Sequence, residues 1–117
     1  MEVEHVFSAL ADPHRRHLLD LLSQTDGQTL TQLSAHLPMS RFGAMKHLRI
    51  LEEAGLIKSR KVGREKLHYL NPAPMQDVAN WVEKYRRLWE ERFDRLEDYL
   101  QQAQKEQDNG RNDHDEP

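Results

Sequence analysis

Positive and large apolar side chains share one face of a predicted helix between residues 41 and 54. The helical period places Ala44, Leu48 and Leu51 on the buried side of this helix. The opposite face then combines Arg and Lys, which can donate to a guanine edge or a phosphate, with apolar groups that can touch a thymine methyl. The side chains on this face are Arg41, Phe42, Met45, Lys46 and Arg49.

Residues at the start and the edge of the same helix extend this chemistry. Ser40 can cap the helix, and a capped helix N-terminus can bind a backbone phosphate. His47 lies between the buried and polar faces and suits a phosphate donor or a packing residue. Gly43 leaves room for close approach of DNA or of the preceding helix. The alternative interpretation is that Phe42 and Met45 fold back onto the core.

A second group of cations surrounds a predicted tight turn at residues 62–64, where Gly63 can supply a positive φ. Strand-like runs at 56–61 and 65–70 flank the turn and predict a β-hairpin. Such a tip can contact phosphate or enter a minor groove, whereas the alternative is that the cations protect an exposed strand edge. The cations are Lys58, Arg60, Lys61, Arg64 and Lys66.

The distribution of charge along the 117-residue chain is uneven, although its net charge is only −3. Residues 41–70 hold eight Lys or Arg against three Asp or Glu, whereas the segments before and after this window are acidic. This pattern suggests that one face of the protein meets an anion. The chain has no cysteine, which excludes disulfides and thiolate metal sites. Apolar runs are too short for a membrane helix, so we expect a cytoplasmic protein with no membrane partner.

The elements needed to position these residues follow from caps and periodicity. The first ten residues predict one amphipathic helix, and Asp12 with Pro13 starts a second that buries Leu18, Leu21 and Leu22. A turn at 25–28 follows the second helix.

A capping box at Thr29 and Gln32 opens a short helix over residues 30–37, which a turn separates from the helix at 41–54. Together with the hairpin, this order predicts a mainly α winged helix-turn-helix fold.

A long helix is predicted from Met75 to about Ala103, and its apolar side chains exceed what one small core can cover. We therefore expect a homodimer through the N- and C-terminal helices, although this helix could instead fold back as a monomeric lid. Residues 1–103 would form the DNA-binding and dimerisation domain, and residues 104–117 a disordered acidic tail. The expected dimer contacts are Val3, Val6, Phe7, Leu10, Trp81, Tyr85, Leu88, Trp89, Phe93 and Leu96.

Motifs for catalysis or metal binding are missing from the sequence. There is no glycine-rich phosphate loop, nucleophile elbow or metalloprotease pattern, so we expect neither an enzyme nor a cofactor. His14 and His17 are spaced like ligands, but two histidines do not complete a zinc site. We therefore predict no metal site.

A family resemblance rests on three strings: ALADPHRRHLLDLL, TLTQLSAHLPMSRFGAMKHLRILEEAGLI and GREKLHYLNP. Over about residues 5–100 they resemble the ArsR-type winged helix-turn-helix transcription repressors. The resemblance implies a homodimer built on the first and last helices, with each subunit offering a recognition helix and a wing to half of an inverted repeat. The Cys-x-Cys motif and the last-helix histidines of the family's metal sensors are missing here, so the resemblance is to a branch without those sites.

These observations predict a sequence-specific DNA-binding regulator, a homodimeric repressor that blocks a promoter by occupying an inverted-repeat operator. One alternative is a winged-helix module that binds another protein through the same basic face. A second alternative is a metal-responsive repressor that uses a non-standard site of histidines and carboxylates.

Overall fold

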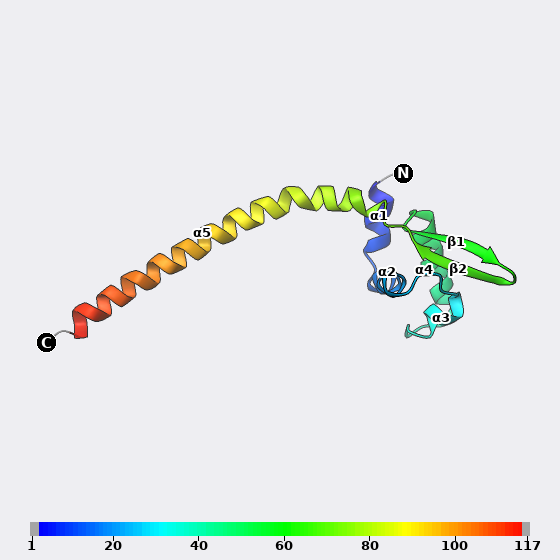
Figure 1. Ribbon diagram of the computed structural model, residues 1–117, viewed down its shortest axis with the longest axis horizontal. Coiled ribbons are helices and arrows are strands. Elements are labelled where there is room, and N and C mark those ends of the chain that lie inside the picture. Colours follow the sequence, from blue (N-terminus) through cyan, green and yellow to red (C-terminus); the bar gives the residue numbers. More distant parts are fainter. Residues whose placement is uncertain (1–2, 116–117) are drawn as a thin grey trace. The chain divides into compact units, whose positions relative to one another are not determined.

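The computed structural model describes the backbone of residues 3–115 and the side chains of residues 3–108. The predicted order of elements is confirmed, with helices making up most of the chain around one hairpin (Figure 1). The elements are α1 (Val3–Leu10), α2 (Pro13–Gln24), α3 (Leu30–Ser34), α4 (Arg41–Glu53), β1 (Ile57–Val62), β2 (Glu65–Leu70) and α5 (Met75–Asp115).

Side-chain caps start α2 and α3 where the sequence predicted them. The Asp12 carboxylate accepts hydrogen bonds from the amides of His14 and Arg15 at 2.8 and 3.2 Å. Desolvation opposes ionisation of Asp12, but these amide hydrogen bonds and the charges of His47 and Arg15 together outweigh it and hold its pKa below the ordinary value. At α3, Thr29 and Gln32 form the complete capping box.

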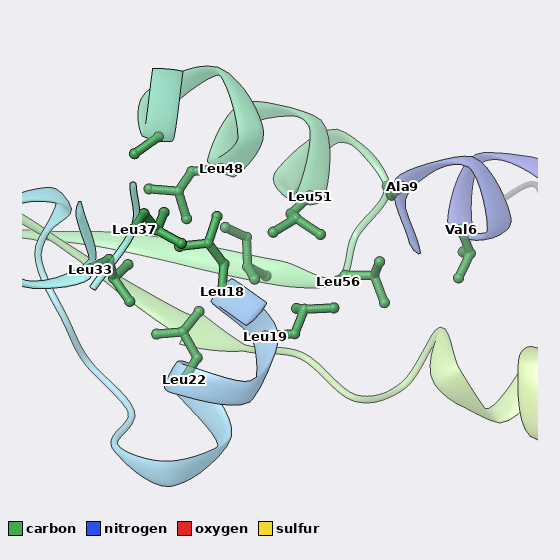
Figure 2. Close-up of a cluster of buried hydrophobic side chains, with 13 residues drawn as sticks. Val6, Ala9, Leu18, Leu19, Leu22, Leu33, Leu37, Leu48, Leu51 and Leu56 are labelled. Carbon is green, nitrogen blue, oxygen red and sulfur yellow. The ribbon is translucent and has the colours of Figure 1, made fainter. Parts of the chain in front are cut away.

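The core lies where α2, α3 and α4 meet the start of the hairpin, and leucine supplies most of it (Figure 2). On α2 the buried residues are Leu18, Leu19 and Leu22, whereas the sequence predicted Leu21 in place of Leu19. Leu21 still packs against the edge of the core. The apolar face of α2 is therefore wide enough to hold four leucines, of which the neighbouring elements fully cover three.

α1 gives two side chains to this core. Val6 is 1% exposed and Ala9 is fully buried, whereas Val3, Phe7 and Leu10 are only partly buried. The expectation that Val6 lies at a dimer interface is therefore corrected, because its surface is already covered within one subunit.

The hairpin pairs β1 with β2 in antiparallel register from Ile57 opposite Leu70 to Val62 opposite Glu65. Gly63 at its tip has φ of 63°, and Gly55, which follows α4, has φ of 78°. Both values lie in the left-handed region that glycine adopts without strain, so the turn predicted at Gly63 is confirmed and Gly55 provides the stop after α4.

A buried polar bridge joins β2 to the segment before α3. The Nδ1 and backbone N–H of His68 lie 2.9 and 2.8 Å from the carbonyl oxygen of Gln28, and the Gln28 amide donates back to the His68 carbonyl at 3.2 Å. The side chain of Gln28 in turn donates to the carbonyls of Leu21 and Thr25. His68 is 4% exposed, so this bridge is buried.

α5 extends beyond the predicted end at Ala103 and continues to Asp115. The backbone of residues 104–115 is therefore helical where the sequence predicted a disordered tail. Gln, Lys and Glu dominate residues 104–107 and have high intrinsic helix propensity, so the helix persists after its apolar stripe has ended. No helix of the described chain is long and apolar enough to span a membrane.

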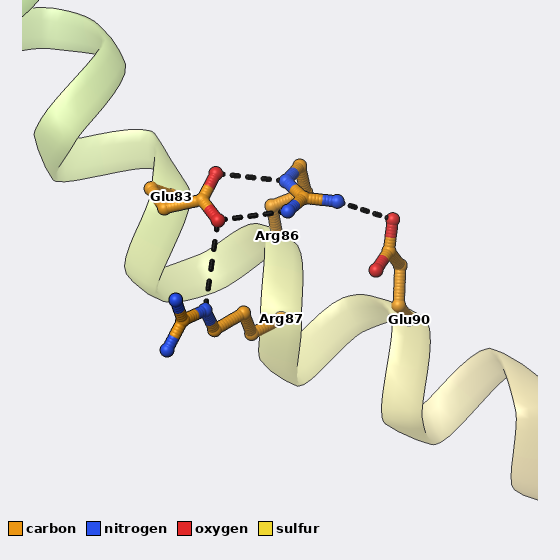
Figure 3. Close-up of polar contacts among 4 residues, drawn as sticks. All are labelled: Glu83, Arg86, Arg87 and Glu90. Carbon is orange, nitrogen blue, oxygen red and sulfur yellow. Dashed lines mark hydrogen bonds and ion pairs between the residues drawn. The ribbon is translucent and has the colours of Figure 1, made fainter.

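The segment from Asn80 onwards forms a unit of its own, separate from the winged unit that ends at Ala79. Its polar side carries a chain of ion pairs in which Arg86 bridges Glu83 and Glu90 at 2.7 and 2.6 Å, and Arg87 reaches Glu83 at 3.5 Å (Figure 3). The side-chain hydrogen bond from Arg86 lowers the pKa of Glu83, and the same contact raises the pKa of Arg86. These pairs at three- and four-residue spacing stabilise the helix locally.

The position of Leu51 in the core generates a prediction about stability. Leu51 is fully buried, so Leu51→Ala should lower the free energy of unfolding by about 2–5 kcal/mol through lost burial and a cavity. The adjacent Ile50 is 39% exposed, so the control Ile50→Ala should cost less than about 1 kcal/mol. Urea denaturation measures both changes, and equal losses would contradict this assignment of the buried face.

Candidate nucleic-acid interface

A groove of about 840 Å³ lies between α3, α4 and the hairpin, all within the winged unit. Its lining combines cationic groups with hydroxyl, amide and apolar groups, and two carboxylates. The lining residues are Gly27, Thr29, Leu30, Thr31, Gln32, Arg41, Met45, Leu48, Arg49, Glu52, Arg64, Glu65, Lys66, Leu67 and His68.

One side of α4 forms a wall of this groove. Arg41, Met45 and Arg49 recur every four residues, and Glu52 continues the same row. The helix begins at Arg41 because the Ser40 side chain accepts a hydrogen bond from the Gly43 amide at 3.1 Å. The groove therefore contains three of the five residues that the sequence placed on the polar face of this helix.

The other two members of that face lie beside the groove rather than in it. Phe42 is 61% exposed, and the ammonium of Lys46 lies 4.8 Å from the centre of its ring. This cation–π contact keeps an aromatic face and a positive charge together at the surface. Phe42 does not fold back onto the core, whereas Met45 is half-buried along the groove wall.

The hairpin divides its cations between the groove and open surface. Arg64 at the tip and Lys66 on β2 line the groove. Arg60 and Lys61 are exposed on β1 and are not part of the lining. Lys61 and Lys66 are direct cross-strand partners, which places two like charges side by side on one face of the wing.

Glu52 is a site residue that sequence analysis did not identify. One carboxylate oxygen accepts a hydrogen bond from the Ser59 hydroxyl at 2.5 Å, and the other lies 3.5 Å from the Lys66 ammonium. The hydrogen bond from Ser59, assisted by the charge of Lys66, lowers the pKa of Glu52. A single carboxylate therefore joins the end of α4 to both strands of the hairpin.

His47 faces α2 rather than the groove. Its Nδ1 lies 3.3 Å from a guanidinium nitrogen of Arg15, and its ring centre is 5.9 Å from that of His14. Arg15 is itself fixed by donation to the carbonyls of Ala9 and Ser8. Of the two roles that the sequence left open for His47, the structure therefore supports packing.

The N-terminal turn of α3 also borders the groove through Thr29, Thr31 and Gln32. The sequence identified Thr29 and Gln32 only as a cap. Their position in the groove lining depends on how α3 packs against α4, which local sequence patterns do not give.

Within the described residues, no three His, Asp or Glu side chains gather into a group that could hold a metal ion. His17 is exposed on α2, and His14 packs near His47.

Comparison with known proteins places this geometry among DNA-binding regulators. Residues 10–60 match the family model described as a helix-turn-helix domain. The transcriptional repressor SdpR of Bacillus subtilis (strain 168) is 35% identical over 80 residues, which cover 68% of this chain and 88% of the repressor.

Two of the solved structures that share the fold illustrate the likeness. An ArsR-like transcriptional regulator from Rhodococcus sp. RHA1 aligns with a TM-score of 0.63 and 34% identity, covering 80% of this chain and 88% of the other. The homodimeric winged helix-turn-helix DNA-binding domain of a possible ArsR-family regulator from Mycobacterium bovis aligns with a TM-score of 0.56 and 25% identity. That alignment covers 78% of this chain and 81% of the other.

The lowered pKa of Glu52 generates a prediction about pH. Because the folded state holds this pKa below its ordinary value of 4.5, ionised Glu52 stabilises the fold above that pH and loses this effect as the pH falls through the folded pKa. Wild type should therefore exceed Glu52→Gln in free energy of unfolding at neutral pH, and the difference should shrink below pH 4.5. Urea titrations across this range measure it, with Glu53→Gln as the control for loss of a neighbouring charge. A difference that grows on acidification would contradict the assignment.

Proposed function

Because this chain belongs to the ArsR family of winged helix-turn-helix DNA-binding transcriptional regulators, we propose that it represses transcription as a homodimer bound to an inverted-repeat operator. The observation that carries the proposal is the groove in which Arg41 and Arg49 of α4 face Arg64 of the wing.

α4 is the element proposed to enter the major groove. Arg41 and Arg49 are two turns apart, about 12 Å along the helix axis, so their guanidinium groups can address base pairs about three or four steps apart. Met45 between them offers an apolar contact to a thymine methyl. Lys46, held against Phe42, adds a charge beside this row.

The wing and the helix starts are proposed to contact the DNA backbone. Arg64 lies at the hairpin tip, where it can contact a phosphate or enter the adjacent minor groove. Arg60 and Lys61 extend the positive surface along β1. Ser40 can donate its hydroxyl hydrogen to a phosphate while its oxygen continues to cap α4.

The apolar stripe of α5 supports pairing with a second copy. Trp89 is 63% exposed and stacks on Phe93, with the ring centres 5.4 Å apart. Tyr85, Leu88 and Leu96 continue the stripe on the same helix and are also exposed. A two-fold axis would let this surface cover itself. Val3, Phe7 and Leu10 of α1 are proposed as further contacts between the two copies. Residues 1–103 would then act together as the DNA-binding and dimerisation domain.

Two recognition helices related by this axis would address half-sites about one DNA turn, or 34 Å, apart. A dimer bound in this way covers the promoter and blocks transcription by steric exclusion. A regulator of chromosomal DNA of this type works in the cytoplasm.

The proposal predicts a palindromic footprint with separable contributions from α4 and the wing. DNase footprinting on the DNA upstream of its own coding region should protect an inverted repeat. Arg41→Ala should relax sequence preference by about 1–3 kcal/mol at one base position in each half-site, because a base contact is lost. Arg64→Ala should weaken binding to all duplexes and reduce the salt slope by about one, because a phosphate contact is lost. Unchanged sequence preference in Arg41→Ala would contradict the proposal that this face of α4 contacts the bases.

The dimer is tested by placing a charge in the α5 stripe. Trp89→Glu should yield monomers by light scattering and abolish operator binding, because a buried carboxylate without a partner is costly. Arg87→Glu places the same charge about 160° away around the helix, on a side chain that is 76% exposed, and should leave the dimer intact. If α5 were a monomeric lid, both variants would retain the mass of the wild-type protein.

A further inference from the structure

The carboxylate of Glu52 lies in a groove whose other charged groups are mainly cationic. Arg41, Arg49, Arg64 and Lys66 line it together with Glu52 and Glu65, which gives the lining a formal charge of +2. DNA phosphates are repelled by a carboxylate in such a position, so Glu52 lowers the affinity of the groove for any duplex. If this surface binds DNA, the loss of affinity caused by Glu52 must be offset by another contribution of the same side chain.

That role follows from the partners of Glu52 on the hairpin. Alternation along the strands puts Ser59, Lys61, Lys66 and His68 on one face, and Glu52 contacts the Ser59 hydroxyl and the Lys66 ammonium on it. The charge of Glu52 also offsets the repulsion between Lys61 and Lys66, which are directly opposite each other. One side chain thus links the end of α4 to both strands of the wing.

We propose that Glu52 determines the sequence specificity of DNA binding, by fixing the wing to the recognition helix and by disfavouring phosphates that enter the groove without base contacts. The inference rests on the proposed DNA-binding role of this groove. A duplex whose bases form hydrogen bonds with Arg41 and Arg49 overcomes the repulsion between Glu52 and the phosphates. A duplex that offers only phosphates does not. Specificity arises from a penalty on the wrong partner as well as from attraction to the right one.

The test compares two duplexes: one selected by the wild-type full-length chain from a random-sequence library, and the same bases in scrambled order. Glu52→Gln keeps the size of the side chain and an acceptor for Ser59 but raises the charge of the groove lining from +2 to +3. Affinity for the scrambled duplex should rise about threefold while affinity for the selected duplex stays equal or falls, so the specificity ratio should drop at least about threefold.

Two further variants separate the effects of charge and restraint. Glu53→Gln removes the neighbouring carboxylate, which is exposed on the same helix, and should leave the specificity ratio within about twofold of wild type. Ser59→Ala removes a partner of Glu52 without changing any charge. Ser59→Ala should lower the affinity for the selected duplex and leave the affinity for the scrambled duplex unchanged.

An unchanged ratio in Glu52→Gln, or an equal fall in Glu53→Gln, overturns the role of Glu52 while leaving the proposed function intact. If the wild-type chain selects no sequence from the library, the proposed function fails first and this inference fails with it. Circular dichroism melts of each variant verify that the compared proteins are folded.

Discussion

The amphipathic character of α4 is the constraint on which the rest of the structure depends. Leu48 and Leu51 must leave water, and α2 and α3 supply the apolar surface that covers them. Because each residue advances about 100° around a helix, this burial also fixes the direction of Arg41, Met45 and Arg49. The same interaction that stabilises the fold therefore orients the side chains that line the groove and are proposed to contact DNA.

The hairpin is attached to this core in two different ways. Its base is apolar and buried through Ile57, and its second strand is held by the bridge between His68 and Gln28. At Ser59, which is opposite His68, and at Lys66 nearer the tip, the carboxylate of Glu52 adds a hydrogen bond and an ion pair to α4. The base of the wing is therefore fixed by burial, whereas its outer part depends on an ion pair that solvent and phosphate can reach.

Charge and apolar surface are divided between the two parts of the chain. The winged unit concentrates cations around its groove, whereas α5 carries exposed aromatic side chains beside a network of paired charges. The net charge of −3 is therefore a poor guide to function, because it sums surfaces with different partners. With long-range attraction partly cancelled, a regulator of this kind depends on direct contacts between its groove and the DNA.

The sequence by itself determined the features that arise within a few residues of one another: the caps at Asp12, Thr29 and Ser40, and the glycine positions at 55 and 63. It also determined the two faces of α4, because helical period alone separates them. Only the tertiary structure decided that His47 meets Arg15, that Val6 belongs to the core, and that Glu52 reaches Ser59 and Lys66. The physical reason is that periodicity gives the angle of a side chain around its own helix. Which neighbour lies at that angle depends on how separate elements pack.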